Sequence, residues 1–583
     1  MNDIFFAAAL VFLFCLIFVI SSNSILFRFF PAYTGQHPFL KIGFSYFFGI
    51  SLFLSLWRLL GLVLSARTSL FISSILLLIV VFLGIRDLKA IKIKTTGILL
   101  VILFALFSFM NIILYLPPDS ASGTALVNVW DKVGSLHSPR YANLVLHIIN
   151  LDRIPAINQH YGQSLLSLAT SSVKMISPYI GLTIWLWVSL IFLLMTFYGA
   201  FREFKLNNFF SFLGVLVMGF GNMTLSLLPC QVIDSGNPWI GCGYTDSIVG
   251  MGTIMFFLFL TVAYLKNKIS TIVYLLMLLP IIITWHMTAT QNILISFPVF
   301  FMAGALILYK TRRIKDVAIT AISFGFLIIF SFVTANTGGM LISSHKADHI
   351  KVPGLMQYNQ KGYPTIQVKP YLRFSYFNNL FGDNAASVYA WDAKEQYSND
   401  RLNNKTKTIN NSVSYKQASV ASIPIEDLIF LLEDYAWKSL RAIFYPLAGM
   451  ILLFIYIFVS KIMSKKSQEL EYYLLLTAVM FAAGVGVAYP FVLKGYKWEL
   501  TRFMIPGGYL GMFFLVIAIV YWLDLFRIKR IYQNLIVSCI VVILIAGHAI
   551  HTGTTVRNYS KAFLTGKHHV VNTLLTQKKM IAE

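Results

Sequence analysis

The sequence predicts an all-α membrane protein that crosses a bilayer about 12 to 14 times. Of its 583 residues, 57% are hydrophobic and 12% are charged, whereas a soluble domain carries about 25% charged residues. Apolar runs of about 20 residues, the length needed to cross the hydrocarbon core, recur along the chain. From the third run onward, every second connection between runs is basic, which is the pattern of a polytopic membrane protein. These three observations exclude a soluble globular enzyme.

Each apolar run is bounded by polar residues, which mark its start and its end. The first run begins at Ile4 without a preceding Lys or Arg and lacks a small-residue cleavage site, so we expect it to be a retained helix. The predicted spans are 4–30, 39–64, 69–85, 96–116, 176–200, 208–229, 246–265, 269–287, 291–309, 317–335, 439–460, 470–493, 503–526 and 531–551.

The basic connections assign the two sides of the membrane. They run from Arg86–Lys94 after the third span to Arg527–Arg530 after the thirteenth, and the positive-inside rule places them in the cytoplasm. The connections 117–175, 230–245 and 494–502 then face outward. The same alternation puts the basic tail outside, against the rule, and one missed or false span near either end would resolve this conflict.

Five segments follow from this topology. They are an N-terminal group of spans at 1–116, a core at 117–335, a polar extracytoplasmic segment at 336–438, C-terminal spans at 439–551 and the basic tail at 552–583. The net charge of +23 is spread through short connections and not gathered in one segment. It therefore indicates contact with membrane lipids and not with nucleic acid.

The four cysteines fall into two kinds. Cys15 and Cys539 lie inside apolar runs and are predicted to be small core residues. Cys230 and Cys242 bracket an outward connection, where an oxidising compartment permits a disulfide. A bridge closing so short a loop would stabilise the fold by roughly 3 kcal/mol; the alternative is a pair of free thiols.

The first outward connection contains two acids, Asp119 and Asp131. After them, apolar residues recur at helical spacing between Ser138 and Asp152, which predicts an amphipathic helix in the interface plane. An acid beside such a helix could act as general base on an acceptor hydroxyl. In the other interpretation, Asp131 pairs with Lys132 or caps a helix.

Two further outward positions carry groups suited to the same reaction. Asp246 precedes an apolar run, where it could cap the helix or complete a pair of carboxylates with Asp131. Arg502 and Lys497 lie just before a predicted span. A guanidinium there could bind phosphate oxygens or anchor the helix in the membrane interface. His286 lies at a short turn on the same face. No metal-ligand spacing or nucleotide-binding glycine loop is present, so no metal or cofactor is indicated.

Several of these elements occur in an order that resembles the GT-C superfamily of polytopic membrane glycosyltransferases. They are Trp-Asp131, Ser-Leu-His137-Ser-Pro-Arg140, His160-Tyr161-Gly-Gln, Tyr244-Thr-Asp246 and Arg502-Phe-Met-Ile-Pro. The resemblance covers roughly 115–310 and 490–525. About three extra spans precede the first outward loop, and the spacing from Asp131 to His137 is longer than in the family, which leaves Asp119 as a rival base.

The resemblance implies an inverting transfer of a sugar from a polyprenyl-phosphate carrier on the external face of a bacterial inner or plasma membrane. Asp131 or Asp119 would be the base, Asp246 a supporting acid and Arg502 a contact of the lipid phosphate. His137, Arg140, His160, Tyr161, Tyr244, His286 and Lys497 would bind substrate. The acceptor would be an envelope glycan, lipid or protein. An envelope-lipid transporter or flippase, and a glycan polymerase or ligase, are the alternatives.

Overall fold

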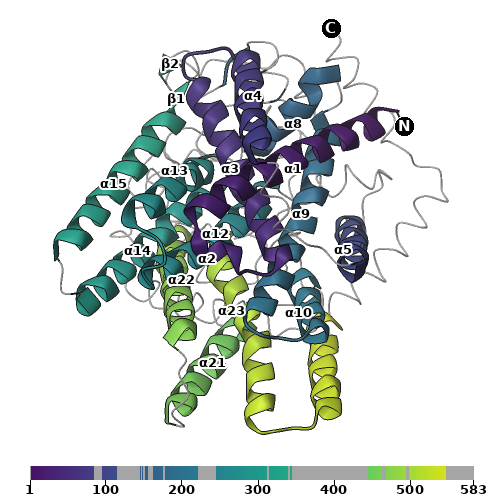
Figure 1. Ribbon diagram of the computed structural model, residues 1–583, viewed down its shortest axis with the longest axis vertical. Helices are drawn as coiled ribbons and strands as arrows, with labels where there is room; N and C mark the ends of the chain where they lie inside the picture. Colours follow the sequence, from purple (N-terminus) through teal and green to yellow (C-terminus); the bar gives the residue numbers. More distant parts are fainter. Residues whose placement is uncertain are drawn as a thin grey trace, which may run out of the picture.

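A computed structural model describes residues 2–84, 95–114, 145, 148, 152–154, 162–174, 178–220, 245–311, 314–338, 342–343, 444–462, 468–493 and 498–546. Nearly all of these residues are helical (Figure 1). The helices are α1 Asn2–Phe29, α2 Pro31–Thr34, α3 Pro38–Leu60, α4 Ala66–Gly84, α5 Thr95–Leu114, α8 Gly162–Lys174, α9 Pro178–Glu203, α10 Asn208–Phe220, α12 Thr245–Leu265, α13 Thr271–Thr288, α14 Thr290–Thr311, α15 Ile314–Asn336, α21 Phe444–Ile462, α22 Gln468–Leu493 and α23 Trp498–Leu525. A last helix covers Arg530–Ala546.

Ten of the described helices are long and apolar enough to cross a membrane: α1, α3, α9, α12, α13, α14, α15, α21, α22 and α23. Four other predicted spans correspond to the shorter apolar helices Ala66–Phe82, Thr95–Phe109, Asn208–Phe220 and Arg530–Ala546. The prediction of a polytopic helical membrane protein is confirmed. The described part of the chain provides ten candidate spans instead of twelve to fourteen, because in these four helices the described apolar stretch has only 10–17 residues.

Helix α12 lies at the centre of the bundle (Figure 1). Its apolar window is 100% buried, whereas that of α15 is only 22% buried. Helix α12 contacts α3, α9, α13, α14 and α22, and α3 in turn contacts α1, α4, α9 and α13. The residues of α12 are therefore held on all sides, while α15 lies at the periphery.

The C-terminal helices α21, α22 and α23 pack against one another and contact the rest of the bundle through α10, α12 and α14 (Figure 1). One polar contact reinforces this junction: the Tyr521 hydroxyl donates to the backbone oxygen of Phe204 at 2.8 Å. Phe204 also packs its ring against Tyr473 and Phe513. The C-terminal group is thus fixed to the end of α9.

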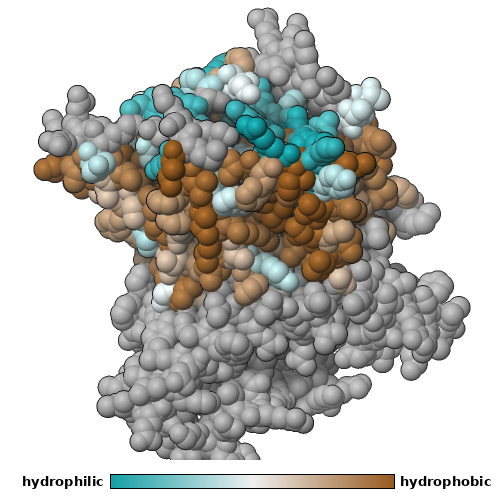
Figure 2. Space-filling model, turned by 90° about the horizontal axis from the view of Figure 1, so that it is seen from below, coloured by the Kyte–Doolittle hydropathy of each residue, from teal (hydrophilic) through white to brown (hydrophobic). Residues whose placement is uncertain are grey.

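Large hydrophobic side chains cover much of the outside of the bundle. Phe71 is 66% exposed and Ile322 is 73% exposed. Figure 2 shows one face on which hydrophobic residues form a broad area beside a band of hydrophilic ones. Such a surface is stable against lipid, because helices satisfy their own backbone groups and hydrocarbon does not penalise apolar side chains.

Contacts gather several of the basic connections at one end of the bundle, where α12 ends; we call this the inner end. Lys266 pairs with Glu469, and Lys461 lies 2.8 Å from Glu471. The opposite end, where α12 begins, is called the outer end. This arrangement agrees with the alternation of basic connections, although which end faces the cytoplasm stays a prediction.

His37 stands at the inner end, just before α3. Its Nδ1 accepts the Phe39 N–H at 3.3 Å as an N-cap, and its own backbone N–H donates to the Glu203 carboxylate at the end of α9. Burial, and after it the positive charge of Arg202, lowers the His37 pKa to about 4. The ring therefore caps α3 in its neutral form.

Arg58 closes the other end of α3. Its fully buried guanidinium donates to the backbone oxygen of Thr334 through Nε at 2.9 Å and through Nη2 at 2.6 Å. Nη2 also donates to Thr337 O. Thr334 lies in the last turn of α15, where the helix has no partner of its own for the backbone oxygens, and Thr337 directly follows the helix. The short antiparallel pair β1 (Thr337–Gly338) and β2 (Ile342–Ser343) follows directly.

One expectation needs correction, and one helix lies where no particular helix was placed. Interfacial helices were expected in the outward connection 117–175, but the range of α8 was not predicted, because its mixed Ser, Thr and Leu residues are not apolar enough to stand out. Cys539 is exposed and is not a core residue, because the helix Arg530–Ala546 lies at the edge of the bundle; Cys15 is buried as predicted. Of the predicted interfacial helix, only Val145 and Ile148 belong to the described residues, and both are helical and buried.

Candidate functional site at the outer end of α12

Asp246 is buried in the first turn of α12. Its Oδ1 accepts the backbone N–H of Gln163, the second residue of α8, at 2.7 Å. A carboxylate at this place satisfies one of the N–H groups that a helix start leaves without a partner, and it complements the positive end of the helix dipole. Asp246 Oδ1 thereby caps α8, a contact that the sequence did not predict.

Gly162 makes this contact sterically feasible. A Cβ atom at Gly162 would lie 2.5 Å from Thr288 Cγ2 and 3.0 Å from Asp246 Oδ1. Any side chain at this position would therefore push α8 away from both the acid and the end of α13. The start of α8, the start of α12 and the end of α13 thus meet around one glycine.

The turn between α13 and α14 closes the other side of this cluster. The Asn292 side chain donates through Nδ2 to the backbone oxygen of Gly250 at 3.0 Å, which joins the start of α14 to the second turn of α12. A Cβ at Gly250 would lie 2.7 Å from the Ala289 Cβ. The Trp285 indole donates to the Thr253 hydroxyl at 2.8 Å, one turn deeper. The ends of α13 and α14 are therefore fixed against α12.

Several buried polar atoms at this end have no hydrogen-bond partner among the described residues. They are Asp246 Oδ2, both polar atoms of the Gln163 side chain, and Gln291 Oε1. Gln163 is 0% exposed and Gln291 is 7% exposed. A buried polar group without a partner costs about 1–3 kcal/mol. Several of them near one set of helix ends are typical of a site that keeps binding groups ready for a polar ligand.

His286, predicted to bind substrate, faces α15. Its ring lies edge-on to Phe332 with centroids 5.9 Å apart, and it hydrogen-bonds the backbone of Ile328. This arrangement favours a packing role between α13 and α15. The predicted contact with substrate stays a prediction.

The other predicted site residues lie mainly outside the described residues. This holds for Asp119, Asp131, His137, Arg140, His160, Tyr161, Tyr244 and Lys497, and for the predicted Cys230–Cys242 bridge. The backbone of Arg502 belongs to α23, four residues before Pro506, but its side chain is not among those described. The pairing of Asp131 with Asp246 is therefore not tested.

Asp152 has a structural contact that the sequence did not predict. Its backbone oxygen accepts the Ala66 N–H at 2.9 Å, and its Oδ1 accepts the Arg67 N–H at 2.9 Å. Asp152 thereby caps α4 in a left-handed conformation, with φ of 49°. The first outward connection is anchored to the turn between α3 and α4, 85 residues earlier in the chain.

Within the described ranges, no group of three or more His, Cys, Asp or Glu side chains is arranged to hold a metal ion. The acid, the two glutamines and the helix ends provide hydrogen-bonding groups. Such a set of groups can bind the hydroxyl groups of a ligand or help to position a catalytic group. Comparisons of the chain with protein-family models, with curated proteins and with solved structures gave no match.

Proposed function

We propose that this protein is a membrane glycosyltransferase that moves a sugar from a polyprenyl-phosphate carrier to a cell-envelope acceptor at the outer end of the bundle. The observation that supports this best is the buried Asp246, whose Oδ2 has no partner within the described structure although its Oδ1 holds α8. A carboxylate kept in that state is typical of a functional site. The order of the sequence elements that resemble the GT-C superfamily adds to it.

In the proposed reaction, Asp131 removes the proton from an acceptor hydroxyl, with Asp119 as the rival base. The hydroxyl oxygen attacks the anomeric carbon of the sugar, and the bond from that carbon to the lipid phosphate breaks. Polyprenyl phosphate leaves with the electron pair, and the anomeric configuration is inverted. The phosphate is already a good leaving group, so positioning and one base provide most of the rate.

Asp246 has a positioning role in this proposal. By capping α8, Asp246 fixes the start of that helix. The helix directly follows the segment 155–161, which contains His160 and Tyr161. Arg502 holds the carrier phosphate through its forked guanidinium. Arg502→Lys keeps the charge and loses the fork, so we expect the KM for the donor to rise more than kcat falls.

The decisive test is transfer by the purified protein in proteoliposomes with a panel of radiolabelled polyprenyl-phosphate sugars. Release of free polyprenyl phosphate, together with label in an acceptor, is the expected result. Asp131→Asn should lower turnover by about 100-fold or more without changing expression, because an amide of equal size cannot accept the proton. Asp524→Asn, at the inner end, is the matched control and should keep normal turnover.

The alternatives predict different outcomes. If Asp119→Asn abolishes transfer and Asp131→Asn does not, Asp119 is the base. A transporter or flippase would move the labelled lipid between leaflets and leave the bond from sugar to phosphate intact. Movement of the intact lipid, with neither Asp119 nor Asp131 required, would refute the proposed glycosyltransferase activity.

A further inference from the structure

Helix α8 has the composition of a surface helix but lies inside the bundle. Gln163, Ser167 and Ser171 follow one another at intervals of four residues, which places them on one side of the helix. An amphipathic helix normally turns such a side toward water. In this structure every residue from 162 to 171 is buried. The polar side of α8 is therefore shielded from water.

This shielding leaves polar atoms without hydrogen bonds. The Gln163 amide and the Ser171 hydroxyl have no hydrogen-bond partner within the described structure, and the same holds for Asp246 Oδ2 and Gln291 Oε1. Each such atom costs free energy relative to a state in which it binds water or a ligand. An arrangement in which α8 opens and these atoms are hydrated or bound would recover that free energy.

Direct contacts bring three of these residues together. The backbone N–H of Gln163 donates to Asp246 Oδ1 at 2.7 Å. Gln291 lies in the first turn of α14, and the next residue, Asn292, donates to the backbone oxygen of Gly250 at 3.0 Å, one turn beyond Asp246. The three residues with unpaired atoms therefore lie where the starts of α8, α12 and α14 meet.

The unpaired atoms of this cluster select the chemistry of a ligand. Asp246 Oδ2, Gln163 Oε1 and Gln291 Oε1 are oxygens, and Gln163 Nε2 is a nitrogen. A phosphate presents mainly acceptor oxygens, which these oxygens cannot satisfy. A hydroxyl group both donates and accepts, so several neighbouring hydroxyls match the set. A carbohydrate carries hydroxyls on adjacent carbons and has this pattern.

A ligand reaches the shielded atoms only if a helix moves, and the packing of α8 favours that helix. It packs mainly against α9 and makes smaller contacts with α1, α12 and α13. Its approach to α9 is close, because a Cβ at Gly181 would lie 2.7 Å from Ser167 Oγ. The hydrogen bond between Gln163 and Asp246 fastens the start of α8 to α12. Helix α8 can thus separate from α12 while it stays packed on α9.

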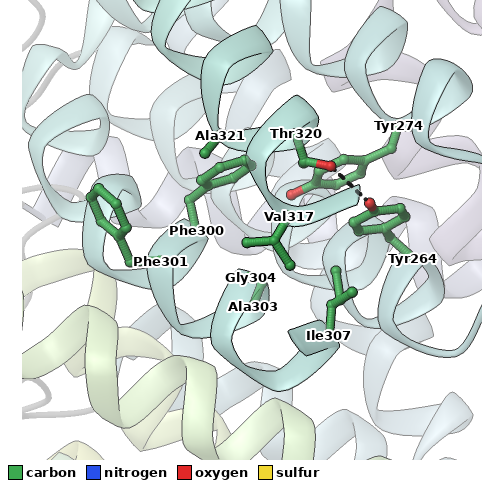
Figure 3. A pocket seen from close by; sticks show the side chains of 10 residues that line it. All are labelled: Tyr264, Tyr274, Phe300, Phe301, Ala303, Gly304, Ile307, Val317, Thr320 and Ala321. Carbon is green, nitrogen blue, oxygen red and sulfur yellow. Dashed lines mark hydrogen bonds between the residues drawn. The ribbon is translucent and has the colours of Figure 1, made fainter. Parts of the chain in front are cut away.

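The hollow beside the inner end of α12 lacks this capacity. There the Tyr264 hydroxyl lies 3.2 Å from Thr320 Oγ1 (Figure 3), and the Tyr274 hydroxyl lies 3.0 Å from Thr261 Oγ1. The volume of the hollow is about 40 Å³, far below the roughly 300 Å³ at which small-ligand pockets begin. A polar ligand is therefore better matched by the outer end.

We propose that hydroxyl groups of a sugar bind between α8 and α12, to the Gln163 side chain, Asp246 Oδ2 and Gln291 Oε1, and that α8 moves away from α12 to admit them. The identity of the ligand as a sugar rests on the proposed function, whereas the movement of α8 does not. The sugar belongs either to the lipid-linked donor or to the acceptor, and the probes below separate these two sources.

Hydrogen exchange followed by mass spectrometry measures the opening in the full-length protein in nanodiscs. The amides of 166–171 in α8 are compared with those of 250–256 in α12, because both sets lie inside buried helices. Without a ligand, the α8 amides should exchange faster, since local opening exposes them. Exchange that is as slow in α8 as in α12 would overturn the proposal.

Ligands are then added one at a time. Members of a panel of polyprenyl-phosphate sugars and methyl glycosides should slow exchange in 166–171, whereas polyprenyl phosphate without a sugar and inorganic phosphate should not. Protection by a lipid-linked sugar assigns the site to the donor, and protection by methyl glycosides alone assigns it to the acceptor. Equal protection by the carrier without a sugar, or no protection by any sugar, would overturn the proposal.

The same measurements separate this inference from the proposed function. Protection by a methyl glycoside in a protein that transfers no sugar would support the binding site and refute the transferase. Sugar transfer without any change of exchange in α8 would support the transferase and refute the binding site. Neither outcome depends on the folding of a variant.

A matched pair of variants sharpens the test. Gln163→Leu removes the unpaired amide, so exchange in α8 without a ligand should slow by about tenfold, the factor that corresponds to one unpaired buried polar group. Protection by sugars should also be lost. Gln533→Leu is the control, because the Gln533 amide is paired and donates to Asp524 Oδ1 at 2.8 Å at the inner end. Unchanged α8 exchange in Gln163→Leu, or the same change in both variants, would contradict the proposal.

Discussion

The buried polar groups at the two ends of α12 differ in whether they have hydrogen-bond partners. At the outer end, Asp246 Oδ2 and the Gln163 side chain are buried without partners among the described residues. At the inner end, the hydroxyl of Tyr264 in α12 pairs with Thr320 of α15, and that of Tyr274 in α13 pairs with Thr261 of α12. The same helix therefore has unpaired buried polar atoms at one end and paired hydroxyls at the other. The difference indicates that a polar ligand belongs at the outer end.

The largest expected effect concerns catalysis at the outer end. Asp246→Asn keeps an oxygen that can accept the Gln163 N–H but removes the carboxyl group beside the start of α8. We expect transfer to fall by about 10- to 100-fold, the range for a catalytic group displaced by about 1 Å. Thermal stability should change little. Normal kcat and KM for Asp246→Asn would confine the acid to a structural role.

Steric substitution compares the two ends directly. Gly162→Leu forces a side chain into space where even a Cβ would lie 2.5 Å from Thr288 Cγ2, whereas a Cβ at Gly304 would lie 3.3 Å from Val317 Cγ1. We expect Gly162→Leu to destabilise the protein by about 3 kcal/mol or more and Gly304→Ala by less than about 1 kcal/mol. Thermal unfolding in detergent, followed by circular dichroism, measures both. Similar losses in the two variants would contradict the difference in packing.

Removal of a polar group should change the free energy of unfolding with opposite signs at the two ends of α12. Gln163→Leu replaces unpaired amide atoms by carbon, which should be neutral or stabilise by about 1 kcal/mol while transfer falls. Tyr264→Phe breaks a satisfied pair and should cost about 0.6 kcal/mol, the average for such bonds within membranes. Chemical unfolding of the two purified variants decides the signs. A loss of stability in Gln163→Leu would show that its amide has a structural partner.

A further expected effect is a pH dependence of stability at the inner end. The His37 pKa is lowered to about 4, from an ordinary value near 6.5. The unfolded chain therefore binds a proton between these two values that the folded chain does not. The stability from this group is complete above pH 6.5 and is lost as the pH falls toward 4. Melting temperatures of the wild type and of His37→Asn should converge over that window, and parallel curves would exclude His37 as the cause.

The sequence was sufficient for the spans and insufficient for the contacts between their ends. Apolar runs located the candidate spans because hydrocarbon selects composition over a fixed length. Helix α8 escaped because its serines and threonines are buried by packing, which composition does not show. The contact of Asp246 with Gln163 joins residues 83 positions apart. No local pattern records such a partner, so the sequence placed Asp246 at a helix start but could not show that it also caps α8.

A contact between residues that are far apart in the sequence also has a consequence for the synthesis of the protein. Arg58 completes α3 by donating to Thr334, 276 residues later in the chain. A ribosome adding about 5–20 residues per second needs roughly 15–55 s to reach that point. During this interval α3 is already made, but the carbonyls that receive its guanidinium do not exist. In an Arg58→Cys variant, we expect the introduced thiol to react with thiol reagents in nascent chains that end before α15 and to be protected in longer chains. The N-terminal half of the bundle would then mature only when α15 has been inserted.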